Sequence, residues 1–136
     1  MKSDEELRKT FEVFVDEENI LRVVILERAN GIEESTRQAE SVEEAVLEIF
    51  NKNPREKYKV VVDLLPLKKG KTYTSAQHRK TWARLASHKQ NKKCVVIGLG
   101  LYLKVVANFI IRLSGKSKDI KWFSDKEKAL KWLKDK

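Results

Sequence analysis

Residues 68–93 form a basic stretch whose positively charged side chains could bind an anionic partner. It contains no acidic residue and nine lysines and arginines, namely Lys68, Lys69, Lys71, Arg79, Lys80, Arg84, Lys89, Lys92 and Lys93. A surface of this charge attracts nucleic acid, anionic lipid head groups or an acidic protein face. No aromatic platform or DNA-binding motif accompanies the charge, so the pattern does not favour nucleic acid. The alternative interpretation is the solvated face of an ordinary surface helix.

Two glycines after an apolar run point to phosphate-binding chemistry, but the motif is incomplete. Gly98 and Gly100 stand between a predicted strand and a predicted helix, where a dinucleotide-binding loop would carry a third glycine. Leu103 occupies that third position. We therefore interpret the two glycines as a tight turn with close packing. An anion at the N-terminus of the following helix stays open as an alternative.

The residue types of a hydrolytic triad or a metal site are present in an unsuitable arrangement. Asp63 ends a predicted strand while Ser75 and His78 open the next helix, yet no nucleophile elbow surrounds Ser75. His78 and His88 do not share a helical face, and Cys94 is the single cysteine. These patterns predict no catalytic residue, no metal site and no cofactor. Cys94 is expected to be an inert residue of a buried strand.

The composition indicates a globular chain whose charge is segregated along the sequence. The 136 residues carry a net charge of +9, and 41% of them are hydrophobic, which is ordinary for a globular domain. Residues 1–67 carry a net charge of −6 and residues 68–136 a net charge of +15. One cysteine excludes an internal disulfide framework and fits a reducing compartment.

No targeting or membrane-spanning segment is expected. The first residues lack the apolar core of a signal peptide. The most apolar run, 94–113, approaches the length of a membrane span, but Lys104 lies at its centre. We therefore expect a cytoplasmic protein that forms one domain over residues 1–136, with frayed ends at 1–9 and 134–136.

Hydrophobic periodicity predicts five strands and four helices. The strands are expected at 11–16, 20–26, 58–65, 93–97 and 119–123. The helices are expected from a capping box of Ser41 and Glu44 to residue 50, at about 74–90, at 101–113, and from a capping box of Ser124 and Glu127 to residue 133. The inner residues of the second helix would be Ala76, Trp82, Leu85 and Ala86. Segment 32–40 is ambiguous. The order predicts a mixed five-stranded α/β sheet with an N-terminal β-hairpin followed by β-α repeats.

Four stretches of the sequence resemble the STAS superfamily in its SpoIIAA-like (STAS/CRAL-TRIO-like) branch. They are Val60 to Asp63 with the following loop, Trp82 to Ala86, Val95 to Gly100, and Trp122 to Leu133 with its Ala-Leu-x-Trp-Leu close. The resemblance covers the chain from about Phe11 to Leu133. It implies a small α/β domain with helices packed mainly on one sheet face. It also implies a binding or regulatory module without chemistry of its own.

The resemblance also implies that the loop after the third strand is a regulatory element. Anti-sigma-factor antagonists of this superfamily carry a phosphorylatable serine there, in an Asp-Ser-Ser-Gly-like turn. This chain has no such turn, and its loop runs from Pro66 to Ser75. Thr74 and Ser75 stand where a helix N-terminus begins, and a phosphate at that place would meet free N–H groups and the helix dipole.

We expect a non-catalytic regulatory module that acts through an acidic protein partner. Its contact residues would be Lys68, Lys69, Lys71, Thr74, Ser75, Arg79, Lys80 and Arg84. The alternative is a binder of an apolar or anionic amphiphilic small molecule beside the apolar helix 101–113, with a lipid-like ligand. Its cavity would be lined by Tyr102, Val106, Phe109 and Ile110. The sequence leaves a monomer and a homodimer both open.

Overall fold

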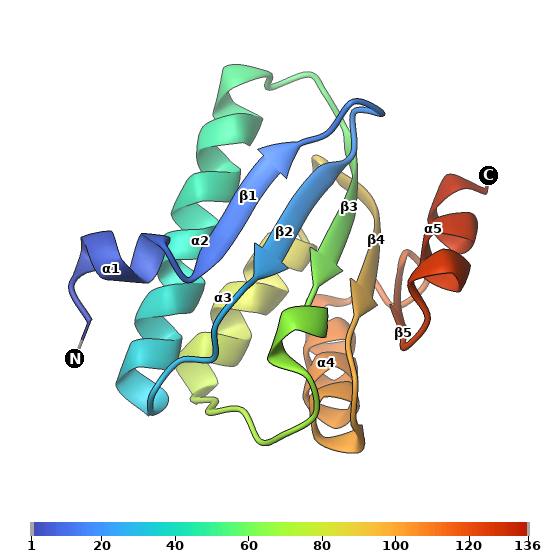
Figure 1. Cartoon of the computed structure of the whole chain (residues 1–136). Coiled ribbons are helices and arrows are strands. Elements are labelled where there is room, and N and C mark those ends of the chain that lie inside the picture. Colours follow the sequence, from blue (N-terminus) through green and yellow to red (C-terminus); the bar gives the residue numbers. More distant parts are fainter. Residues whose placement is uncertain (1, 136) are drawn as a thin grey trace.

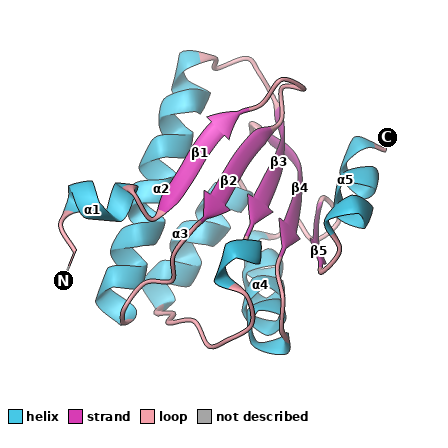
Figure 2. Cartoon of the chain, viewed as in Figure 1, coloured by secondary structure: helices cyan, strands magenta, loops and turns pink. Residues whose placement is uncertain are grey.

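The protein folds around a five-stranded mixed sheet. The computed structural model describes residues 2–135, and Figures 1 and 2 show the arrangement of its elements. The strands are β1 (Phe11–Val15), β2 (Leu21–Ile25), β3 (Tyr58–Asp63), β4 (Asn91–Ile97) and β5 (Ile120–Phe123). The helices are α1 (Asp4–Arg8), α2 (Ile32–Lys52), the 3₁₀ turn η1 (Leu65–Leu67), α3 (Ala76–Ala86), α4 (Leu101–Ser114) and α5 (Lys126–Lys134).

The strands lie in the sheet in the same order as in the chain. β1 pairs with β2 in antiparallel fashion, and β2, β3, β4 and β5 run parallel to one another. The arrowheads of β2, β3 and β4 in Figure 2 therefore point the same way, and the loops that leave them gather at one end of the sheet. The predicted N-terminal hairpin and β-α repeats are confirmed.

The helices cover the two sheet faces unequally. Side chains alternate along each strand, so residues such as Val60 and Cys94 point to one face while Val61 and Val95 point to the other. The first face packs against α2, α3 and α4, and the second packs against α5. The expectation of helices mainly on one face is therefore confirmed.

Helix α2 begins at Ile32, nine residues before the predicted capping box at Ser41. The ambiguous segment 32–40 is its first half, which lacks an apolar stripe because three of its four buried residues, Glu34, Ser35 and Gln38, are polar. Ser35 and Gln38 are buried, and each donates to a distant carbonyl: the Ser35 hydroxyl to Tyr73 O at 2.5 Å and Gln38 Nε2 to Glu27 O at 3.1 Å. Satisfied hydrogen bonds allow polar side chains on the inner face of a helix.

Two other helix boundaries differ from the sequence expectation. The final helix is capped by Asp125, whose carboxylate accepts from Lys128 N, so the predicted capping box at Ser124 is wrong. Helix α3 ends at Ala86 instead of near residue 90, and Ala76 at its start is exposed. The glutamine that was expected at the helix end, Gln90, is buried and donates to the carbonyls of Phe50, Asn53 and Glu56.

The N-terminal segment, for which the sequence pattern predicts a frayed end at 1–9, contains the short helix α1. Ser3 and Glu6 form a capping box that starts α1, and Leu7 is fully buried. Burial of one leucine contributes about 1.5–3 kcal/mol toward holding α1 against the rest of the protein. At the other end, Lys134 closes α5, and residue 136 lies outside the described residues.

Candidate functional site

A mainly apolar cavity of about 140 Å³ lies between the sheet and the helices that cover its first face. Its floor comes from β2, β3 and β4, with Val23, Val62 and Val96 among the lining side chains. Its walls come from α2, α3 and α4, and the loop after η1 contributes Thr72. Two of the residues that line it from α3 and α4, Ala86 and Ala107, have small side chains.

Three polar side chains in the cavity wall each keep one buried atom without a hydrogen-bond partner. These atoms are Arg28 Nε, His78 Nδ1 and Asn91 Oδ1. Residues 2–135 contain no other buried side-chain nitrogen or oxygen that lacks a hydrogen-bond partner. His78 is 9% exposed and Asn91 is 5% exposed. An unpaired buried polar group costs about 1–3 kcal/mol. Their gathering on one cavity therefore marks it as the candidate binding site.

The state of His78 follows from its neighbours. Trp82 Nε1 donates to His78 Nε2 at 3.3 Å, so in the neutral ring Nδ1 carries the proton. Burial, together with the charge of Arg79, lowers the pKa of His78 to about 4. His78 is therefore neutral near pH 7 and offers an unused N–H donor to the cavity.

The predicted ligand-lining residues of α4 divide into two pairs. Val106 and Ile110 line the cavity. Tyr102 and Phe109 point outward and are exposed. The ring of Phe109 lies beneath the guanidinium of Arg79, whose carbon is 5.5 Å from the ring centroid.

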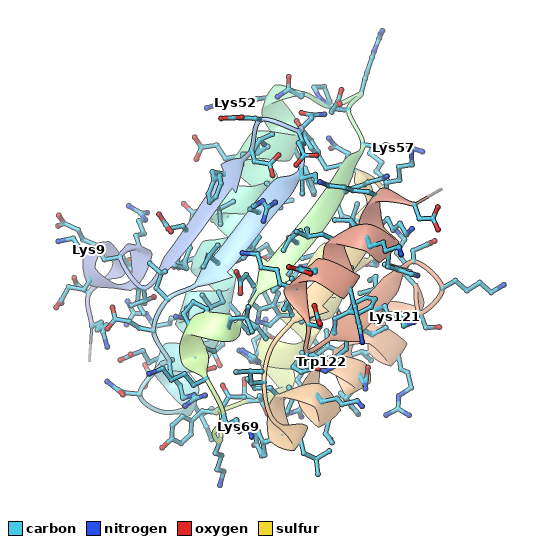
Figure 3. The ribbon with its side chains drawn as sticks, turned by 45° about the vertical axis from the view of Figure 1, so that its right-hand side comes forward. Lys9, Lys52, Lys57, Lys69, Lys121 and Trp122 are labelled. Atoms are coloured by element: carbon cyan, nitrogen blue, oxygen red, sulfur yellow. The ribbon has the colours of Figure 1, made fainter. Side chains whose placement is uncertain are left out.

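The lysines of the loop after η1 form an exposed basic rim beside the start of α4. Lys68, Lys69 and Lys71 are exposed, and no acidic side chain of the described part of the chain pairs with them. A side chain added at Gly100 would lie 3.4 Å from Lys69 Cγ, so this loop touches the turn before α4. Figure 3 shows Lys69 at the lower end of the molecule, beyond η1.

The rest of the predicted contact surface is partly engaged within the protein. Arg84 forms two short bonds with Glu43 of α2, at 2.6 and 2.8 Å, and so does not offer a free charge. Thr74 accepts from Arg79. Ser75 caps α3 by accepting from His78 N at 2.9 Å, and its hydroxyl also bonds Thr36. Lys80 is exposed. The loop lysines and Lys80 are therefore the accessible part of the predicted set.

Helix α4 presents an apolar stripe to solvent. Leu101, Val105, Phe109 and Leu113 recur at every fourth residue and are 46–76% exposed. The surrounding chain is basic, because residues 64–118 contain thirteen lysines and arginines and no acidic residue. Since the strand order follows the chain order, the strands of the acidic half of the sequence lie toward one edge of the sheet and those of the basic half toward the other edge.

The structure does not assemble the hydrolytic triad that could be drawn from the sequence. Asp63 lies on the face covered by α5, where it accepts from Leu65 N and pairs with Lys126 at 3.8 Å. Ser75 and His78 belong to the other face. Burial raises the pKa of the Cys94 thiol to about 12, which fits the expected inert residue.

The paired glycines serve packing, as the sequence indicated. A side chain on Gly98 would come within 2.6 Å of the Trp122 ring, and Gly100 has a positive φ of 93°. Within residues 2–135, no three His, Cys, Asp or Glu side chains converge as a metal site. None of the helices described is both long and apolar enough to cross a membrane.

Two polar residues of the cavity wall were not singled out by the sequence interpretation. Arg28 lies in a polar segment after β2, and Asn91 was placed in the loop before β4. Each is a single polar residue near a strand end, a pattern that is common in turns and carries no spacing signal. Only the packing of the three helices on the sheet turns them toward one cavity.

Comparison with known proteins establishes the fold. No family model matches the sequence, and a search of curated proteins gives no significant match. The crystal structure of an uncharacterized protein of the DUF3478 family from Shewanella loihica PV-4, described as having a SpoIIAA-like fold, superimposes with a TM-score of 0.59. The alignment covers 90% of this chain and 91% of that chain at 15% sequence identity. This chain therefore has a SpoIIAA-like, STAS-like fold, as the sequence resemblance predicted.

Proposed function

We propose that this protein is a non-catalytic binding module that holds a small apolar or anionic amphiphilic molecule between its sheet and helices α3 and α4. The observation that carries the proposal is the cavity of about 140 Å³ behind α4. An engineered protein cavity of about 150 Å³ lined by aliphatic and aromatic side chains takes up benzene. The available space therefore suits a ring or a short to medium alkyl chain.

The surroundings of the cavity support binding over catalysis. Its lining is mostly aliphatic, and its one titratable imidazole, His78, is neutral and bonded to Trp82. Proton transfer requires a base within hydrogen-bond reach of a reacting group, and nucleophilic catalysis requires a paired nucleophile. The hydroxyl of Ser75, which precedes His78 in the sequence, already caps α3 by accepting from His78 N.

Filling the cavity tests this function. The probe is octanoate, measured by isothermal titration calorimetry, with native mass spectrometry of the protein as isolated from its own cells. Ala107→Leu places three additional carbons in the cavity and should weaken octanoate binding at least tenfold. Val105→Leu changes the exposed side of the same helix, where Val105 is 58% exposed, and should bind like the wild type. Equal binding by both variants would show that octanoate does not use this cavity.

A second candidate function is the docking of an acidic protein partner. The exposed apolar stripe of α4 and the unpaired lysines beside it favour a partner that is both acidic and apolar. Lys69→Glu combined with Lys80→Glu should abolish its capture. Lys9→Glu combined with Lys57→Glu makes the same change in net charge far from α4 and should leave capture intact (Figure 3). Loss with both pairs would indicate unspecific attraction by net charge.

A further inference from the structure

We propose that the cavity selects a molecule with two polar ends, an anionic carboxylate that meets Arg28 and His78 and a hydroxyl that meets Asn91. The inference rests on the proposed ligand-binding function and names the chemical class of the ligand. It is carried by the three buried polar atoms without partners, because two of them are donors and the third is an acceptor.

Arg28 supplies a positive charge that an anionic ligand would neutralise. Its Nη2 donates to Leu67 O at 3.0 Å, which fixes the guanidinium at the cavity wall, while its Nε has no partner. No carboxylate among residues 2–135 forms an ion pair with Arg28. A partly buried guanidinium without a counter-charge is costly, whereas a bound carboxylate can accept from it in a charge-assisted pair.

His78 adds a second donor, from the N-terminal turn of α3. Because Nε2 accepts from Trp82, the unpartnered Nδ1 is the nitrogen that carries the proton. His78 lies in the first turn of α3, where the helix dipole also favours an anion. The exposed lysines at 68, 69 and 71 lie in the loop that leads into this helix and add to the positive potential.

Asn91 marks the opposite end of the ligand. Its Nδ2 donates to Ala86 O at 2.9 Å, at the last residue of α3, so the unpartnered Oδ1 can only accept. Ala86 follows His78 by eight residues, which is about 12 Å along a helix. The two ends of the cavity are thus separated by the length of a medium alkyl chain, with the apolar lining between them.

Three probes of equal chain length separate the two contacts. They are octanol, octanoate and ω-hydroxyoctanoate, each titrated into the full chain by calorimetry. Octanoate should bind roughly 10–100 times more tightly than octanol, because a charge-assisted hydrogen bond contributes more than a neutral one. The added hydroxyl of ω-hydroxyoctanoate should improve binding by a further factor of about 2–10.

Substitutions assign each gain to its residue. Arg28→Met should reduce octanoate affinity by about 10–100-fold and leave octanol affinity within about twofold. Arg55→Met removes the same charge from an exposed position and should leave both affinities unchanged. Asn91→Leu should remove only the advantage of the hydroxyl. If that variant fails to fold, a crystal structure of the ω-hydroxyoctanoate complex decides whether the hydroxyl meets Oδ1.

Each alternative outcome overturns a defined part of the inference. Equal affinity for the three probes would refute the polar assignments while the cavity-filling experiment still supported ligand binding. Equal losses in the Arg28 and Arg55 variants would show that net charge, not a local contact, attracts octanoate. Ordered waters on Arg28 Nε and His78 Nδ1 in the octanoate complex, with the carboxylate elsewhere, would also refute it. No binding of any probe to the wild type would refute the proposed function itself.

Discussion

Replacing Ala107 by leucine should make the empty protein more stable. Cavity volume costs about 24 cal/mol per Å³ in well-studied cores. At that rate, the roughly 140 Å³ beside Ala107 corresponds to about 3 kcal/mol. A leucine side chain fills about half of this space and loses about 0.5–1 kcal/mol of conformational entropy. The net expectation is a gain of about 1 kcal/mol in the free energy of unfolding.

Urea denaturation with linear extrapolation measures this gain, since the midpoint should rise while the slope stays constant. Val105→Leu on the exposed side of α4 should change stability by less than about 0.5 kcal/mol. With octanoate present, the wild type should become more stable than Ala107→Leu. A ligand at a hundred times its dissociation constant adds about 2.7 kcal/mol to the free energy of unfolding of the protein that binds it. A loss of 1 kcal/mol or more in Ala107→Leu, with an unchanged ranking in octanoate, would refute the reasoning, since it would mean that the space is already packed.

Three further measurements test other parts of the structure. Gln90→Met leaves one buried and two partly buried carbonyls without their shared donor, and urea denaturation should show a loss of about 2–4 kcal/mol. Because burial lowers the folded-state pKa of His78 to about 4, the unfolded state binds more protons below the ordinary His pKa, and stability should fall as the pH drops from about 6.5 to 4. His78→Phe should flatten this dependence, and an unchanged slope would contradict the assignment. A double-mutant cycle between Arg84 and Glu43 should give a coupling free energy of about 0.5–1 kcal/mol. A coupling of zero would mean that the Arg84 charge is available to a partner.

The order and faces of the elements could be predicted because apolar residues recur with regular periods. The runs at 58–65 and 93–97 were recognisable as buried strands, and the apolar helix at 101–113 was placed within one residue of α4. The first half of α2 was not recognised, because Ser35 and Gln38 are buried there through bonds to distant carbonyls. Periodicity detects apolar burial and cannot detect polar burial that depends on tertiary partners.

The candidate site was harder to predict than the fold. Sequence indicated the helix that walls the cavity, but not that Arg28, from a segment far from it in the chain, faces the same space. It also predicted a free positive charge at Arg84, which pairs with a residue forty-one positions earlier. Long-range pairing of this kind depends on how α2 and α3 pack, and local spacing carries no information about it.

The identity of strand order and chain order has a consequence for synthesis. Each β-α unit can dock beside the unit that precedes it as the chain leaves the ribosome, without waiting for a later strand to be inserted between them. One step is delayed: Val61, Val95 and Ile97 stay uncovered until α5, which follows all five strands in the sequence, is released. A nascent chain stalled before residue 126 would therefore expose an apolar sheet face, and that intermediate is where a chaperone would be needed.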